Sequence, residues 1–209
     1  MSIKTPSPPG LELPSFEVKN GGPDLQFDDK QLEVLANEYA LTNYKGEGFE
    51  DTAKWQARAL ERLRDLIRQP TSSLIYDGDR LVAVGGYDRK NDTTDGKPVL
   101  ELTMAIRDPS YKGQNLGTLL YTARMDSIRT LYPDGIVSIL SFQKQVWALA
   151  GQNKFTEVPL EEWLLRTNDE RSNSGMEGYN FKAFIFNLGE VTEGTKDTAH
   201  ALHDTIPEL

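Results

Sequence analysis

LELTMAIRDPSYKGQNLGTLLYTARM, residues 100–125, is the stretch of sequence that decides the fold. It begins with apolar residues of high strand propensity and reaches a break at Asp108-Pro109. A short polar loop over residues 110–115 follows, with glycines at positions 113 and 117. Apolar residues then recur at helical spacing, at Leu116, Leu119, Leu120, Ala123 and Ile128. The stretch therefore predicts a strand, a glycine-bearing loop and the N-terminus of a helix.

The start of the predicted helix is suited to binding an anion. About four backbone N–H groups at a helix N-terminus lack intrahelical partners, and the helix dipole makes that end partly positive. Glycines allow a ligand to approach the backbone, and Lys112 adds a mobile positive charge. The stretch contains neither the GxxxxGK[ST] P-loop nor the GxGxxG dinucleotide fingerprint. It predicts a phosphate or pyrophosphate site of another class.

Composition and charge narrow the class of protein. The chain has 209 residues, enough for one domain with a sizeable core, and a formal net charge of −9. A negative chain disfavours non-specific binding to nucleic acid or to an anionic membrane, so neither partner is expected. There is no cysteine, and the only histidines, His200 and His203, lie near the C-terminus, so we expect no metal site. No secretion signal or membrane span is visible, which predicts a cytoplasmic protein.

The residues before the deciding stretch predict an extended segment, two helices and a hairpin. Residues 1–24 hold five of the eleven prolines and are expected to be extended, with an edge strand within residues 11–18. Asp28 and Asp29 are N-cap candidates for a helix that reaches about Asn43. A second helix is predicted over residues 50–69. An Asp-Gly turn at residues 77–78 joins two predicted strands, residues 72–76 and 81–87.

The residues after the predicted helix indicate further strands and short helices. We expect strands at residues 136–142, 155–158 and 179–188. A short helix over residues 143–150, capped by Gly151, and a helical turn over residues 161–166 lie between them. Residues 189–209 are acidic and poor in apolar residues, so they are expected to be a disordered tail.

Residues 107–117, reading RDPSYKGQNLG, resemble the acyl-CoA signature of the GNAT superfamily of N-acetyltransferases, V-x-P-x-[YF]-[RQ]-G-x-G-x-[GA]. Two positions depart from it. Lys112 replaces the usual Arg or Gln, and Asn115 replaces the central Gly. Asn tolerates a left-handed backbone better than most residues, so the second departure is mild. The order of the predicted elements is also similar to that of the GNAT fold.

The resemblance implies an α/β (α+β) fold with a single GNAT-like domain over residues 25–188. Its sheet would be mixed but mostly antiparallel and flanked by helices, with a splayed pair of parallel strands at the CoA site. Residues 1–24 and 189–209 would lie outside this domain.

The resemblance also implies which residues would contact acetyl-CoA or another acyl-CoA. The pantetheine arm would pair with the strand before the motif. The pyrophosphate would meet the loop and the first helical turn, and Gln143 would keep a hydrogen-bonding role or be only a polar residue at a helix start. These cofactor-binding candidates are Ala105, Ile106, Arg107, Lys112, Gly113, Gln114, Asn115, Leu116, Gly117, Thr118 and Gln143.

Glu101 is the candidate general base, since many members of the superfamily carry a base on this strand. The alternative is a Glu101 side chain on the opposite face of the strand, because a register shift of one residue reverses the face. The family's usual tyrosine acid has no counterpart, because Ala150 occupies its position. Tyr111, Tyr121, Tyr132 or a water molecule could protonate the leaving thiolate, and the sequence leaves this choice open.

The implied function is transfer of an acetyl group from acetyl-CoA to a primary amine by direct attack. The acceptor would be a small-molecule amine or an amino group of a peptide or protein. The loop over residues 167–178 and the segment 46–49 would border the acceptor groove, and a homodimer is left open. One alternative is a non-catalytic GNAT-fold module that binds a CoA thioester or a protein. Another is an interaction protein in which Gly117 is a close-packed core residue.

Overall fold

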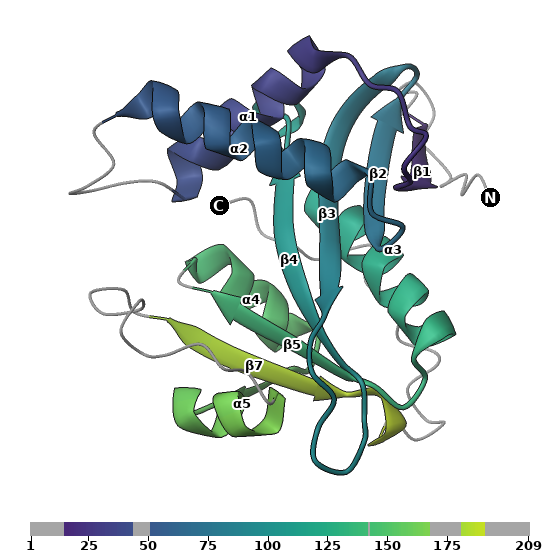
Figure 1. Ribbon diagram of the computed structural model, residues 1–209, viewed down its shortest axis with the longest axis vertical. Coiled ribbons are helices and arrows are strands. Elements are labelled where there is room, and N and C mark those ends of the chain that lie inside the picture. The colour runs from purple at the N-terminus through teal and green to yellow at the C-terminus, as the bar shows by residue number, and fades with distance from the viewer. Residues whose placement is uncertain (1–14, 44–50, 142, 168–180, 191–209) are drawn as a thin grey trace. The chain divides into compact units, whose positions relative to one another are not determined.

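The computed structural model describes residues 15–43, 51–141, 143–167 and 181–190 of the chain. The chain divides into two compact units. The first unit runs to Tyr87 and continues with residues 104–126, and the second comprises residues 88–103 and those from Ser127 onward. Strands β3 and β4 and helix α3 run through both units (Figure 1).

Strands in the order β1-β2-β3-β4-β5-β7-β6 form a mixed sheet. Strands β4 and β5 pair in parallel, whereas β1–β2, β2–β3, β5–β7 and β6–β7 pair antiparallel. The sheet and its flanking helices confirm the predicted fold class. Within the described ranges, no helix is long and apolar enough to cross a membrane. The elements are β1 (Phe16–Asn20), α1 (Asp29–Asn43), α2 (Thr52–Ile67), β2 (Ser72–Asp77), β3 (Arg80–Arg89), β4 (Val99–Arg107), η1 (Pro109–Tyr111), α3 (Leu116–Leu131), β5 (Ile136–Ser141), α4 (Lys144–Gln152), β6 (Thr156–Val158), α5 (Leu160–Thr167), β7 (Lys182–Asn187) and η3 (Leu188–Glu190).

Helices cover both faces of the hairpin in the first unit. Alternation along β2 sends Leu74 to one face and Ile75 to the other, and both side chains are fully buried. Helices α1 and α2 lie side by side over the Leu74 face, with Leu35 and Leu63 in the same cluster (Figure 1). Helix α3 packs against the Ile75 face through Leu116 and Leu120. The hairpin therefore fixes the start of α3 relative to the strands.

A backbone irregularity in β4 was not predicted. Met104 has a φ of +32°, in a region that side-chain-bearing residues rarely adopt. On β3, a Cβ atom built on Gly85 would lie 2.8 Å from the Met104 carbonyl oxygen and 2.9 Å from Leu120 Cδ2. Only glycine fits at position 85, because any side chain there would collide with the distorted strand and with α3.

The second unit is built around β5 and β7. Val99–Glu101 of β4 pair in parallel with Ile136–Ser138 of β5, and β7 pairs antiparallel on the other side of β5. Helix α5 lies along β7 and α4 along β5 (Figure 1). Trp163 of α5 is fully buried and anchors an apolar cluster on one face, whose other buried members are Val99, Ile136, Val158, Ala183 and Ile185.

Several boundaries differ from the predicted ones. The edge strand is β1 (Phe16–Asn20), within the segment predicted as extended, rather than residues 11–18. Gly151 does not cap α4, because the helix runs through it to Gln152 and the Asn153 N–H closes the last turn on Ala150. Lys154 then takes the left-handed conformation, with a φ of +61°. The predicted groove segments 46–49 and 168–178 and the tail 191–209 lie outside the described residues.

Replacing Gly85 with alanine tests the close approach between β3 and β4. We expect Gly85→Ala to cost about 1–3 kcal/mol, as overpacking does in a tight core. For a chain of this size each kcal/mol lowers the melting temperature by about 2–4 °C. Gly22→Ala is the matched control, since nothing lies within 4 Å of a Cβ built at that glycine. Equal melting temperatures for the two variants in thermal denaturation would contradict the close approach.

Candidate functional site

The connection from β4 to α3 in the first unit begins with a buried carboxylate. Asp108 is 3% exposed, and its backbone N–H donates to the Val82 carbonyl oxygen at 2.8 Å. Its Oδ1 accepts from the Ser110 backbone N–H at 2.9 Å and from the Ser110 hydroxyl at 2.6 Å. Asp108 thereby caps η1, and Pro109 suits the first helical position because it has no N–H to satisfy.

The hairpin turn between β2 and β3 contacts this first half of the loop at two points. The Arg80 guanidinium donates to Asp108 Oδ2 at 2.5 Å and lies 5.5 Å from the centre of the Tyr111 ring. The Tyr111 hydroxyl donates to Asp77 Oδ2 at 2.7 Å. The loop is thus held at Asp108 and at Tyr111 by one turn of the chain.

These contacts shift two pKa values. Burial alone would raise the pKa of Asp108, but the hydrogen bonds from Ser110 and the Arg80 charge outweigh it and lower that pKa below its usual value. Burial, followed by the hydrogen bond to Asp77, raises the pKa of Tyr111. A hydroxyl that already donates to a carboxylate and has a raised pKa is a poor proton donor for a thiolate. Among the tyrosines that the sequence left open, Tyr111 is therefore the least suited to be the acid.

The second half of the loop is exposed and has the backbone shape of an anion cradle. Gly113 and Asn115 have φ angles of +84° and +55°, so Asn115 takes the left-handed conformation that asparagine tolerates better than most residues. Lys112, Gln114 and Gly117 are exposed like them. Left-handed residues within an exposed loop are typical of the concave backbone segments that bind anions through their N–H groups.

Helix α3 begins at Leu116, as predicted, and its first turn is accessible. Leu116 is fully buried and anchors the turn, and the Leu119 N–H closes it on the Asn115 carbonyl oxygen at 3.0 Å. Gly117 and Thr118 are exposed, and nothing lies within 4 Å of a Cβ built on Gly117. The suggestion that Gly117 is a close-packed core residue is therefore wrong. The open space over the helix N-terminus can hold an anion.

The strand residues before the loop have different roles. Ala105 and Arg107 are exposed on β4, whereas the Ile106 side chain is 6% exposed and packs with α1 and α2. Ile106 could contact a ligand only through its backbone. The unpredicted distortion at Met104 lies directly before them, and backbone strain of this kind is concentrated at functional sites.

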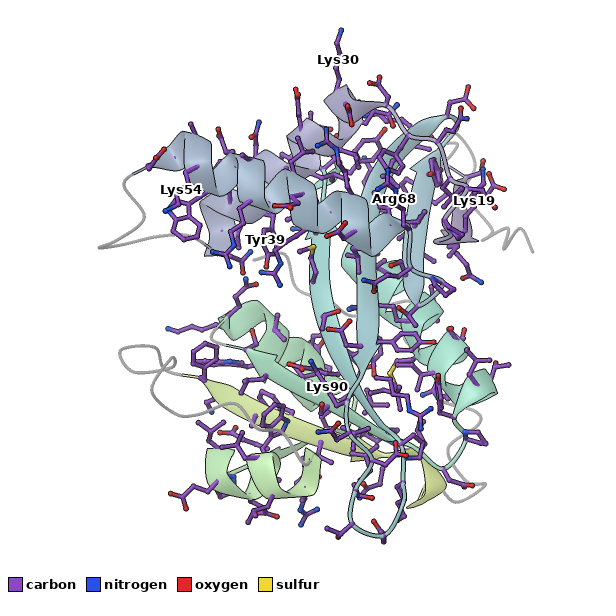
Figure 2. The ribbon with its side chains drawn as sticks, in the orientation of Figure 1. Lys19, Lys30, Tyr39, Lys54, Arg68 and Lys90 are labelled. Atoms are coloured by element: carbon purple, nitrogen blue, oxygen red, sulfur yellow. The ribbon has the colours of Figure 1, made fainter. Side chains whose placement is uncertain are left out.

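Glu101 lies in the second unit and is 5% exposed, so it is not a solvent-facing residue. Its Oε2 is 3.1 Å from Lys90 Nζ, which lies 3.7 Å from Asp88 Oδ2; Figure 2 labels Lys90. Ser138 is opposite Glu101 in the parallel ladder and fully buried, and its Oγ has no hydrogen-bond partner among the residues that the structure describes. The ion pair compensates for much of the cost of burying the carboxylate.

Gln143 and the positions considered for the general acid also lie among the described residues. Gln143 is the N-cap residue of α4 in the second unit but makes no side-chain cap hydrogen bond. Ala150, at the position of the family's tyrosine, is fully buried. Tyr121 is 6% exposed on α3, and the Tyr132 ring lies 5.8 Å from the Arg89 guanidinium carbon. In the parts of the chain that are described, no group of three His, Cys, Asp or Glu side chains could hold a metal ion.

Ten of the twelve predicted site residues lie in one continuous strand–loop–helix segment of the first unit, and Glu101 and Gln143 lie in the second. Sequence reasoning missed Asp77, Arg80 and Lys90, because nothing in their spacing links them to the site. The signal that the sequence offered for Arg80 was an arginine directly after the Asp-Gly-Asp turn at residues 77–79.

Comparison with known proteins identifies the fold. No protein-family model matches the chain, and no curated protein sequence matches it. Solved structures do match. An acetyltransferase from Streptococcus agalactiae is 13% identical with a TM-score of 0.57, covering 83% of this chain and 98% of its own. The PaiA N-acetyltransferase of Thermoplasma acidophilum, in complex with coenzyme A, is 12% identical with a TM-score of 0.56, covering 83% and 99%.

A mosquito arylalkylamine N-acetyltransferase-like protein is 15% identical with a TM-score of 0.57, and the match covers 83% of this chain and all of the mosquito chain. At these identities the likeness concerns the fold alone. The chain has the fold of the GNAT N-acetyltransferases, as its strand–loop–helix segment predicted.

Acidification tests the Asp108 carboxylate. A lowered pKa in the folded state means that this group stabilises the fold above its unfolded pKa of about 3.9 and that the contribution is lost as the pH falls through the lower folded value. We expect Asp108→Asn to lower the melting temperature most at pH 7, with a difference that shrinks below about pH 4. The matched control is Asp29→Asn, which breaks an exposed ion pair with Arg64 worth about 0–1 kcal/mol. A difference for Asp108→Asn that does not change with pH would contradict this role.

Proposed function

We propose that this chain is an acyl-CoA-dependent N-acyltransferase that transfers acetyl from acetyl-CoA to a primary amine. The observation that carries the proposal is the exposed first turn of α3, with open space over Gly117 and Lys112 beside it. A diphosphate carries the negative charge that a helix N-terminus and a lysine favour. The GNAT fold and the CoA in the Thermoplasma structure support the same choice of ligand.

The chemistry needs a proton acceptor and a proton donor. A neutral amine attacks the thioester carbon, a C–N bond forms and the C–S bond breaks; the nitrogen loses a proton and the sulfur gains one. We assign the first proton to Glu101, a buried carboxylate on β4. For the second, Tyr121, Tyr132 or a water molecule stays open, while the Tyr111 hydroxyl is held by Asp77.

The acceptor is proposed from charge alone. A net charge of −9 favours a cationic acceptor over an anionic one, so we propose a small-molecule amine or an amino group of a peptide or protein. The second candidate function is a module with this fold that binds a CoA thioester without catalysis. Ala150, a buried residue without a proton to donate, is the observation that favours it.

Gly117→Glu tests the phosphate site. The substitution places a side chain and a negative charge in the open space at the start of α3. The fold should tolerate it, because a glutamate in the first helical turn is favourable by about 0.3–1 kcal/mol and is a better helix former than glycine. The ligand should not, because like charges a few ångströms apart repel strongly. We expect a melting temperature at or above that of the unchanged chain and loss of CoA binding by calorimetry.

Thr122→Glu is the matched control, since Thr122 is exposed on the same helix about 7.5 Å further along its axis. It adds the same charge away from the first turn and should retain CoA binding. If Gly117→Glu binds CoA as tightly as Thr122→Glu, the phosphate site is placed wrongly.

Glu101→Gln tests the base. The substitution keeps the size of the side chain but removes proton acceptance, so turnover of acetyl-CoA should fall by ~10²-fold or more while CoA affinity changes little. Glu157→Gln is the control in the same unit, because Glu157 forms an exposed ion pair with Lys182 at 2.8 Å. Steady-state rates that fall equally in both variants, or in neither, would remove Glu101 from the mechanism. CoA binding without turnover over a broad panel of amines would favour the non-catalytic module.

A further inference from the structure

The turn of the β2–β3 hairpin contributes two residues that hold the β4–α3 loop from outside the recognised motif. Arg80 donates to the buried Asp108 carboxylate at 2.5 Å, and Asp77 accepts from the Tyr111 hydroxyl at 2.7 Å. We call these four residues the hairpin clamp. All of them lie in the first unit, and the two pairs are separated by 28 and 34 positions in the sequence.

We propose that the hairpin clamp is a positioning element for the cofactor loop, and that Asp77 and Arg80 set CoA affinity without contacting CoA. This inference rests on the proposed function. The clamp fixes the loop from Asp108 to Tyr111, and Lys112 follows directly. A loop that is ordered before the ligand arrives does not lose its conformational freedom on binding, so it binds more tightly.

The contacts of the hairpin clamp hold the first half of the loop, residues 108–111, and leave the second half, residues 112–115, exposed. Asp108 is 3% exposed and takes three hydrogen bonds through its carboxylate. The Tyr111 ring has the Arg80 guanidinium 5.5 Å from its centre and the Phe16 ring edge-on at 6.1 Å. Beyond Tyr111, residues 112–115 are exposed and include two left-handed residues. The exposed half follows directly from the anchored half, so the position of the anchored half determines where the exposed half begins.

The same contacts argue for positioning rather than direct binding. The Arg80 guanidinium is held between the Asp108 carboxylate and the Tyr111 ring, although its side chain is 49% exposed. The Tyr111 proton is directed to Asp77. Loss of the hairpin clamp should therefore weaken CoA binding because the loop becomes disordered. No protein charge or hydrogen-bond donor that contacts CoA would be removed.

Hydrogen exchange and calorimetry on the full chain test the clamp. In Arg80→Met, amide exchange over residues 110–117 should rise in the absence of CoA, and the Kd for CoA should rise about 10-fold. Tyr111→Phe keeps the ring and removes only the hydrogen bond to Asp77, so it should give a smaller rise in both. Arg80→Lys keeps a positive charge opposite Asp108 but not the planar guanidinium beside the Tyr111 ring, so it should restore most of the CoA affinity, to within about 3-fold of the unchanged chain. Arg64→Met, which breaks an exposed arginine–aspartate pair in the same unit, should change neither quantity.

The outcomes separate the inference from the proposed function. A folded Arg80→Met variant with unchanged exchange and unchanged Kd overturns the clamp while the proposed function stands. A rise in Kd with no rise in exchange, whether or not Arg80→Lys restores affinity, would make Arg80 a direct ligand contact and also overturn positioning. If the unchanged chain does not bind CoA, the proposed function fails and the claimed effect on affinity fails with it. The exchange measurement on Tyr111→Phe covers the case in which Arg80→Met does not fold.

Discussion

The buried carboxylate of Asp108 is the interaction on which the candidate site depends. Many loop conformations could join the end of β4 to the start of α3. Here the turn is fixed because Asp108 must find partners for its charge where water is excluded, and it finds them in Ser110 and Arg80. Ser110 follows Asp108 in the same loop, whereas Arg80 comes from the β2–β3 hairpin. Satisfying one buried group therefore fixes the chain direction at the point where β4 becomes η1.

A second constraint acts through space rather than charge. The distorted backbone at Met104 brings its carbonyl oxygen toward β3, where only Gly85 leaves room, and Leu120 of α3 fills the rest of that space. The distortion of β4, the glycine at position 85 and the packing of α3 therefore depend on one another. The same distortion directly precedes Ala105 and Arg107, which are exposed on β4 on either side of the buried Ile106.

The sequence predicted most of the elements, including the strand–loop–helix segment that holds ten of the twelve candidate site residues, because these elements depend on local signals. Apolar periodicity, the break at Asp108-Pro109 and the asparagine in a left-handed position can all be read within a few residues. The contacts of Arg80 and Lys90 could not be predicted in this way. Arg80 meets Asp108 across 28 positions and Lys90 meets Glu101 across a loop, and pairing between distant residues is set by strand register rather than by local propensity. The helix end at Gln152 was missed because Gly151 is a permissive residue, whereas the left-handed conformation was taken by Lys154.

Glu101 shares its ion-pair partner with a second carboxylate. Lys90 Nζ lies 3.1 Å from Glu101 Oε2 and 3.7 Å from Asp88 Oδ2. The attraction of one ammonium group is therefore divided between two carboxylates, so the burial of Glu101 is not compensated by an exclusive ion pair. The buried Ser138 hydroxyl opposite Glu101 has no hydrogen-bond partner among the described residues and adds a polar group on the same face of the sheet. The surroundings of the carboxylate are therefore those of a polar site within an otherwise apolar strand pair.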